Sequence, residues 1–192
     1  MGTEITHRRR EPAPAIFRLV LPLPFPGLDR VNAFLLADGD GYTLVDCGIY
    51  LPDDGRDHGW DDLVEALAVC GVDISAVTRL IVTHPHIDHY GMAGRVVERS
   101  GAELWMHEVA GEDLELYRDP SSIAARLREM FVQHGVGEEE LEELTQYEDW
   151  RPFVSGVVEA TNPVAGGETL TIGHREWEFV YTPGHARSHV CL

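Results

Sequence analysis

The chain contains no lysine, so all fifteen of its basic residues are arginines, and thirty-three acidic residues outnumber them. The resulting formal net charge of −18 gives a surface that repels the phosphate backbone of nucleic acids. We therefore expect no nucleic-acid partner. Acidity is also common among ordinary soluble proteins, so the charge does not identify a substrate.

Cysteine is scarce and long apolar runs are missing. The three cysteines, Cys47, Cys70 and Cys191, are widely spaced and form neither a zinc knuckle nor a disulfide framework. No run of about 18 apolar residues is present, so we expect no membrane-spanning helix. Met1–Pro14 lacks the apolar core of a signal peptide and is interpreted as a polar tail. Together these features favour a cytoplasmic protein.

Motifs for several common chemistries are missing too. The sequence has no glycine-rich motif that cradles phosphate, no Gly-x-Ser-x-Gly motif of serine hydrolases and no internal repeat. Its 192 residues are 44% hydrophobic, which is ordinary for a globular domain with a real core. We expect one domain over residues 1–192.

The most informative stretch, residues 80–91, has the sequence LIVTHPHIDHYG. Its apolar, β-branched start is typical of a buried parallel strand, and Pro85 prevents that strand from continuing. His84 and His86 should therefore lie on a turn just past the carboxyl end of the strand, where open α/β sheets bind ligands. Residues i and i+2 of an extended turn point the same way, so both imidazoles can reach one metal ion.

Two further ligand-type residues, Asp88 and His89, follow where the next helix would begin and can face a second ion beside the first. The alternative is that these side chains only pack. Buried without a metal, they would need a partner for every ring nitrogen and for the carboxylate. An H-x-H-x-D-H array at a strand end is therefore better explained as a metal site.

At these residues the chain resembles the metallo-β-lactamase superfamily. The segment Thr83–His89 matches the signature of that superfamily, and the resemblance extends to Leu44–Gly48 upstream and Thr182–His185 downstream, in the family's order. The resemblance implies an α/β fold (α+β by some schemes), namely an αββα sandwich. It is specific for the superfamily, although not for any one activity within it.

The resemblance also implies two ligand sets. The first ion would bind His84, His86 and His185, which leaves a position open for water. The second ion would bind Asp88 and His89. Zn²⁺ suits imidazole with carboxylate, and Fe or Mn also accept such sets. Two ions are expected in a complete domain.

Three more residues have less certain roles. In the family, the residue that matches Asp46 lies behind the metal ligands, which agrees with the usual pairing of carboxylate and imidazole; the alternative is a carboxylate that caps a turn. His107 is expected in the core or at the rim of the site rather than on a metal. His189 could face the same cleft, but a satisfied or surface histidine is favoured.

The resemblance implies a metal-dependent hydrolase that acts on a small molecule. A metal-activated water would attack a carbonyl or phosphoryl centre, with Asp88 as the catalytic residue that orients the water or accepts a proton. We favour ester or thioester cleavage, as in glyoxalase II-like proteins. Oxygen-reducing relatives carry Glu in place of His86, which argues for hydrolysis. The alternatives are a mononuclear iron sulfur dioxygenase and a catalytically silent metal-binding or interaction module.

Periodicity places these motifs on alternating strands and helices. Strands are expected at Ile16–Leu21, Val31–Leu36, Tyr42–Asp46, Leu80–Val82, Glu103–His107, Gly166–Ile172 and Trp177–Tyr181. Helices are expected at Asp61–Cys70, Gly91–Ser100, Asp113–Tyr117, Ser121–His134 and Glu138–Gln146. The proline-rich Leu21–Gly27 and the polar Pro52–Gly59 are expected to be loops. The helical insert, about residues 108–158, is a candidate substrate lid.

The chain departs from the family at its end. Family members continue past the segment around His185 into a second half, which supplies an aspartate that bridges the metals and a last histidine for the second ion. Neither can be assigned before Leu192. We therefore expect an αββα sandwich that is incomplete at the C-terminus, and a longer natural protein.

Overall fold

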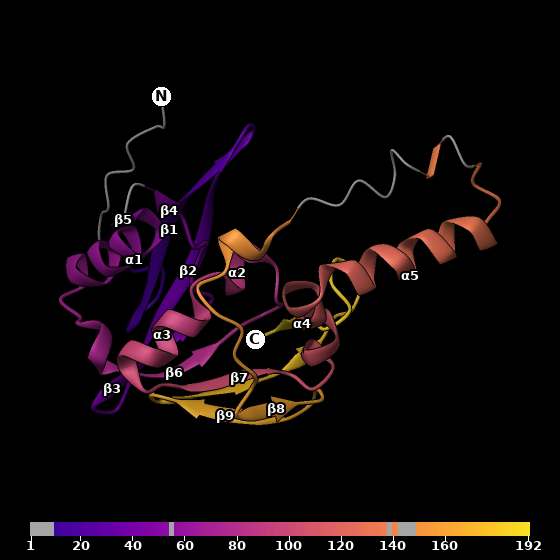
Figure 1. Ribbon diagram of the computed structural model, residues 1–192. Helices are drawn as coiled ribbons and strands as arrows, with labels where there is room; N and C mark the ends of the chain where they lie inside the picture. Colours follow the sequence, from indigo (N-terminus) through magenta and orange to yellow (C-terminus); the bar gives the residue numbers. More distant parts are fainter. Residues whose placement is uncertain (1–9, 54–55, 138–139, 142–148) are drawn as a thin grey trace.

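The computed structural model describes residues 10–53, 56–137, 140–141 and 149–192 (Figure 1). Its main element is a six-stranded sheet in the order β1-β2-β3-β6-β7-β8. The strands are β1 Ile16–Phe25, β2 Leu28–Asp38, β3 Gly41–Val45, β6 Val77–Ile81, β7 Glu103–His107 and β8 Asn162–Val164. The first three pair antiparallel, and β3, β6, β7 and β8 pair parallel.

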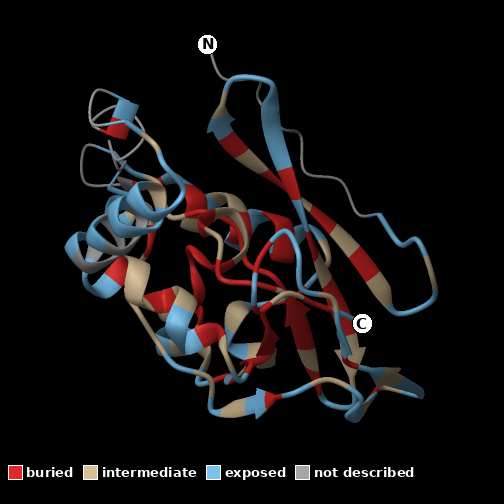
Figure 2. Cartoon of the chain, turned by 90° about the vertical axis from the view of Figure 1, so that its right-hand side faces the viewer, coloured by how far each residue is buried: buried red, intermediate tan, exposed pale blue. Residues whose placement is uncertain are grey.

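Helices cover one face of this sheet. They are α1 His58–Val69, the short α2 Ile87–Tyr90 and α3 Ala93–Ser100. Buried side chains from these helices and from β1, β2, β3, β6 and β7 form the larger core cluster, in which Leu63, Tyr90 and Val96 are fully enclosed (Figure 2). The 3-10 turn η1 Ile74–Ala76 leads into β6. This face is the helix-on-sheet layer that the sequence predicts.

The other face carries small β elements. The hairpin of β9 Thr169–Ile172 and β10 Arg175–Glu178 is antiparallel, and β11 Val180–Tyr181 pairs with β12 Val190–Cys191. Side chains from these elements meet the sheet in a second, smaller cluster, with Phe179 and Ile81 at its centre. The chain therefore has the helix, sheet and partial second β layer of an α/β sandwich. The expected strand Trp177–Tyr181 is divided between β10 and β11.

The prediction that Leu21–Gly27 is a loop was wrong. Strand β1 continues to Phe25, and its register shifts between Pro22 and Phe25. The prolines are tolerated because β1 is the edge strand of the sheet, where a missing backbone donor costs no ladder hydrogen bond. Strand β8 was not predicted.

The segment Pro52–Gly59 also differs from the expected loop. It contains a short pair, β4 Pro52–Asp53 and β5 Arg56–Asp57, and α1 begins at His58. The helix thus starts before the expected first residue, Asp61, and Asp57 caps it by accepting a hydrogen bond from the backbone N–H of Trp60 at 3.0 Å. Asp61 instead lies in the first turn.

The single helix expected over residues 91–100 is interrupted near its start. Gly91 ends α2, and α3 begins at Ala93. A Cβ at Gly91 would lie 2.8 Å from both the carbonyl oxygen of Phe153 and the backbone nitrogen of Tyr50. Only glycine allows this approach of three backbone segments, and it brings α2 close against the sheet. The predicted helix end at Gly101 is confirmed.

Two of the three helices predicted between β7 and β8 are present. They are α4 Ala110–Arg118 and α5 Pro120–Gln133, and α5 extends away from the sheet (Figure 1). On α5, Met130 is 42% exposed. The third predicted helix, Glu138–Gln146, lies outside the described residues apart from residues 140–141. The 3-10 turn η2 Arg151–Phe153 leads back to the sheet. Among the described residues, no helix is long and apolar enough to cross a membrane.

Candidate metal centre

The candidate site lies past the carboxyl ends of the parallel strands. Strand β6 ends at Ile81, and the loop that follows it carries His84 and His86 before α2 begins at Ile87. Asp46 directly follows the neighbouring strand β3. Because parallel strands end at the same edge of a sheet, these side chains converge there.

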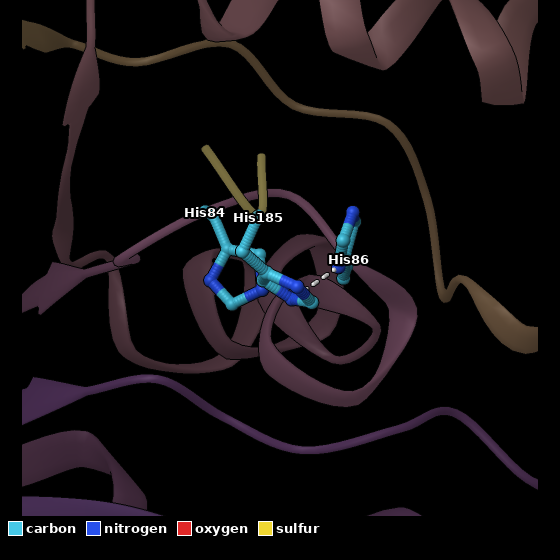
Figure 3. A group of neighbouring side chains, drawn as sticks. All are labelled: His84, His86 and His185. Carbon is cyan, nitrogen blue, oxygen red and sulfur yellow. Dashed lines mark hydrogen bonds between the residues drawn. The ribbon is translucent and has the colours of Figure 1, made fainter. Parts of the chain in front are cut away.

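Three histidines come together at this edge (Figure 3). The ligand atoms of His84, His86 and His185 all lie within 4.8 Å of one another, although His185 comes from the loop after β11. The Nδ1 atom of His86 is 3.0 Å from Nε2 of His185. His84 is 3% exposed, and its buried Nε2 has no hydrogen-bond partner among the described residues. A buried nitrogen lone pair without a partner, beside two more imidazoles, fits a metal ion.

The electrostatics at His84 and His86 favour neutral rings. Burial, followed by repulsion from His89 and the other neighbouring histidines, lowers the pKa of His84 to about 3. Burial and the nearby His185 also lower the pKa of His86. Neutral imidazole is the form that binds metals, so these rings are ready for an ion at neutral pH without losing a proton.

Asp88 and His89 form a different environment next to the trio. His89 lies between two carboxylates, with Nδ1 2.8 Å from Asp46 Oδ2 and Nε2 3.3 Å from Asp88 Oδ2. Burial disfavours the charge on His89, but its hydrogen bonds to both carboxylates outweigh burial and raise its pKa to about 10. Burial alone would raise the pKa of Asp88, but the hydrogen bond and charge of His89 lower it. Asp88 and His89 thus converge as a carboxylate and a protonated imidazole.

Asp46 and Thr83 connect the two groups. Asp46 has a left-handed backbone (φ 58) and accepts hydrogen bonds from the backbone N–H of Thr83 at 2.8 Å and from its hydroxyl. The Thr83 oxygen lies 3.0 Å from Nδ1 of His84. Since the hydroxyl hydrogen is given to Asp46, the oxygen is left to accept the Nδ1–H of His84, which leaves Nε2 of that ring free as a ligand.

The two histidines of less certain role are also placed. His107 hydrogen-bonds the carbonyl oxygen of Ala165 and the backbone N–H of Val109 and stacks on Tyr181 with ring centroids 4.1 Å apart. This favours the core or rim role. His189 places its ring centroid 4.9 Å from that of His84, with Nδ1 2.7 Å from the hydroxyl of Thr182.

A cavity of about 690 Å³ opens beside the second group. Asp46, Thr83, Asp88, His89 and His189 line its polar side. The rest of the lining is mainly apolar and comes from β1, β2 and the segments around Trp177 and Val190. The cavity thus places an apolar lining beside Asp88 and His89.

Sequence reasoning missed two residues of α4 that contact the histidine loops. The hydroxyl of Tyr117 donates to the carbonyl oxygen of Pro85 at 2.6 Å, and Asp113 accepts a hydrogen bond from Ser188 at 2.5 Å. Their four-residue spacing places them on one helix face, which the sequence could reveal. Their partners lie far along the chain, and no local pattern identifies them.

Comparisons with known proteins agree with this geometry. The family model described as "Metallo-beta-lactamase superfamily" matches residues 26–192. An N-acyl homoserine lactonase, AttM of Rhizobium radiobacter, is 28% identical over 184 residues, which cover 90% of this chain and 59% of that protein. A probable metallo-hydrolase, YybB of Bacillus subtilis, is 24% identical and covered to 59% of its length. The chain thus spans less than two thirds of the curated relatives it matches.

A solved structure shows the same arrangement of elements. The crystal structure of a metallo-beta-lactamase family protein from Thermus thermophilus aligns with a TM-score of 0.73 and 30% sequence identity. The alignment covers 93% of this chain and 55% of that chain. The likeness thus includes nearly all of the sheet and helices described above.

Proposed function

Because the chain belongs to the metallo-beta-lactamase superfamily, as its H-x-H-x-D-H array indicated, we propose that it provides the metal-binding part of a hydrolase. The bond that it acts on is an ester, including a cyclic ester, or a thioester. His84, His86 and His185 would hold one ion, and Asp88 and His89 would contribute to a second. The ion would lower the pKa of water and polarise a substrate carbonyl.

One observation carries this proposal. His84 presents a buried ring nitrogen without a hydrogen-bond partner among the described residues, next to the ligand atoms of His86 and His185. A purely structural histidine at this depth would cost stability through its unsatisfied nitrogen. A metal ion removes that cost.

Asp88 is the side chain proposed to accept the proton of the attacking water. Asp88 is half-buried beside the cavity, and its lowered pKa keeps it ionised at neutral pH. It can therefore orient a water molecule and accept its proton. Asp46 would keep His89 in place while this occurs, since it holds Nδ1 of that ring at 2.8 Å.

The cavity and the relatives support the proposed substrate class. The cavity places an apolar lining next to the polar residues of the site, which suits an acyl compound with a reactive carbonyl at one end. AttM is named as an N-acyl homoserine lactonase, and a lactone is a cyclic ester. We therefore place lactones and thioesters first among the substrates to test.

The test uses protein expressed from its complete natural gene, stripped of metal and reloaded with Zn²⁺, Mn²⁺ or Fe²⁺. Lactones, thioesters and simple esters are assayed for hydrolysis, and the Asp88→Asn variant is the control for the carboxylate. We expect metal-dependent hydrolysis of at least one carbonyl substrate and its near loss in Asp88→Asn. Oxygen uptake with a persulfide and Fe²⁺, without hydrolysis, would instead identify a sulfur dioxygenase. A protein that binds metal but catalyses neither reaction would be the silent binding module.

A further inference from the structure

The three histidines of the proposed first site come from two loops that are far apart in the sequence. His86 and His185 are separated by 99 positions, yet their ring nitrogens are 3.0 Å apart. One loop follows β6 and contains Pro85 between His84 and His86. The other follows β11 and contains His185 and Ser188. A ligand set divided in this way needs contacts that fix one loop against the other.

Helix α4 contacts the first loop through Tyr117. The tyrosine hydroxyl donates to the carbonyl oxygen of Pro85 at 2.6 Å in a buried hydrogen bond, and the side chain is 6% exposed. Its ring lies parallel to that of Tyr90, with centroids 6.1 Å apart. The hydroxyl is therefore aimed at the peptide between the two histidines by a packed ring.

The same helix contacts the second loop through Asp113. Ser188 is 1% exposed and donates its hydroxyl to Asp113 Oδ2 at 2.5 Å. The preceding residue, Arg187, forms an exposed ion pair with Glu112. The part-buried hydrogen bond between Ser188 and Asp113 is the more specific of the two contacts, since exposed ion pairs contribute little.

Asp113 and Tyr117 are four residues apart in α4, so they lie on one face of the helix. We infer that this face is a clamp that holds the two histidine loops together and thereby sets the geometry of the first metal site. This inference rests on the proposed metal site, and it assigns positioning roles to Asp113 and Tyr117 that the ligand motif does not contain. Part of the segment expected to be a lid thus supports the site.

The opposite side of the second loop has a separate connection. The backbone N–H of Val190 donates to the carbonyl oxygen of Thr83 at 2.9 Å, and Thr182 is bound to His189 within the loop. The loop is therefore held on two sides, by β12 and by α4. Loss of the clamp should leave the loop attached but let His185 move relative to His84 and His86.

The test measures metal binding rather than turnover. Tyr117→Phe removes one hydroxyl and keeps the ring stacked, and Ser188→Ala removes the other bond while leaving the Asp113 carboxylate near His86. Glu115→Gln is the matched control, because Glu115 lies on the same helix and pairs with Arg118 at the surface. Metal-free protein is titrated with Co²⁺ against a competing chelator, and its visible absorption spectrum reports the ligand geometry.

We expect each single variant to bind the first Co²⁺ about tenfold more weakly, with an altered spectrum. This is the usual effect of removing a residue that holds a metal ligand in place. The double variant should be weaker than either, and Glu115→Gln should match the unmodified chain. Thermal unfolding of the metal-free proteins shows whether each variant is folded.

Unchanged affinity and spectra in both Tyr117→Phe and Ser188→Ala would overturn the clamp. An equal loss in Glu115→Gln would also overturn it, because general destabilisation of α4 would then explain the effect. The His84→Ala variant separates this inference from the site itself. If His84→Ala loses Co²⁺ while the clamp variants do not, only the clamp is wrong; if His84→Ala keeps Co²⁺, the metal site is wrong.

Discussion

The two halves of the candidate centre are built from similar residues but differ in charge. The trio of His84, His86 and His185 consists of imidazoles, and the pKa of His84 is lowered to about 3. A few ångströms away, His89 lies between Asp46 and Asp88 with its pKa raised to about 10. Neighbouring histidines of one motif thus hold opposite protonation states at neutral pH because their neighbours differ.

This difference predicts how each half accepts a cation. In the trio, His84 has a buried ring nitrogen without a hydrogen-bond partner among the described residues and, with its pKa lowered to about 3, no proton to release. The second half already has a positive charge, the proton on His89, between its two carboxylates. A metal ion at Asp88 and His89 must replace that proton. The first half is therefore prepared for metal, whereas the second half must exchange a proton for it.

Removal of one ligand from each half gives the largest expected effect. His84→Ala should lower the affinity for the first ion by more than the roughly 100-fold that loss of an outer-shell partner costs, because a direct ligand is removed. His89→Ala should leave the first ion bound. Elemental analysis after dialysis against a weak chelator measures both. Equal retention of metal by the two variants would remove the distinction between the halves.

The pH dependence of binding is the next test. Affinity at the second half should increase about tenfold per pH unit between pH 6 and about 9, since one proton leaves His89 for each ion bound. At His84 no proton needs to leave for an ion to bind in this range, because the pKa of that ring is lowered to about 3. Calorimetry in buffers of different ionisation enthalpy counts the protons directly. Release of as many protons with the first ion as with the second would contradict the difference between the two halves.

The stability of the metal-free chain should depend on pH in both directions. His89 has a folded pKa of about 10 against an ordinary value of 6.5, so its contribution is full below pH 6.5 and lost as pH rises toward 10. His84 has a folded pKa of about 3, so its protonation in the unfolded chain removes stability as pH falls from 6.5 toward 3.

Denaturant unfolding between pH 4 and 10 measures this profile. Each histidine changes the unfolding equilibrium by at most about tenfold per pH unit. His89→Gln should flatten the alkaline side and also weaken the acid side in part, because His89 helps to lower the pKa of His84 and of Asp88. His84→Gln should flatten mainly the acid side. If stability still falls at alkaline pH in His89→Gln as it does in the unmodified chain, a group other than His89 causes the fall.

Candidate ligands are easier to find in the sequence than the residues that surround them. His84, His86, Asp88 and His89 lie within one short segment, and strand β7 has the predicted bounds Glu103–His107. Short patterns of this kind can be identified from neighbouring residues alone. The opposite charge states of His84 and His89 do not follow from the motif, because they depend on Asp46 and on burial.

The errors in the fold have similar causes. The strand β1 is continuous through Pro22 because it lies at the edge of the sheet, and strand order is a property of the whole fold. Asp57 caps α1 although Asp61 also has a suitable side chain. The contacts of Asp113 and Tyr117 join α4 to loops that lie far from it in the sequence. In each case the sequence allows more than one local structure, and contacts with distant segments determine which one forms.

The smallest expected effect tests the connection between the two halves. Thr83→Val keeps the shape of the side chain and the backbone hydrogen bond to Asp46 but removes the hydroxyl that Asp46 and His84 share. Nδ1 of His84 then loses its acceptor, so its ring is oriented less well toward the metal. We expect first-ion affinity to fall about tenfold, at the low end for an outer-shell partner.

In Thr83→Val, Asp46 still accepts a hydrogen bond from Nδ1 of His89 at 2.8 Å. The loss of folding stability as pH rises toward 10 should therefore be the same as in the unmodified chain. Thr83→Ser keeps the hydroxyl and should behave as the unmodified chain. Chelator competition measures the affinity for the first ion, and denaturant unfolding at pH 7 and 9 measures the change in stability at alkaline pH. If Thr83→Val changes the loss of stability at alkaline pH but keeps the affinity for the first ion, the hydroxyl orients Asp46 and His89 rather than His84. The two halves would then be connected only through the backbone.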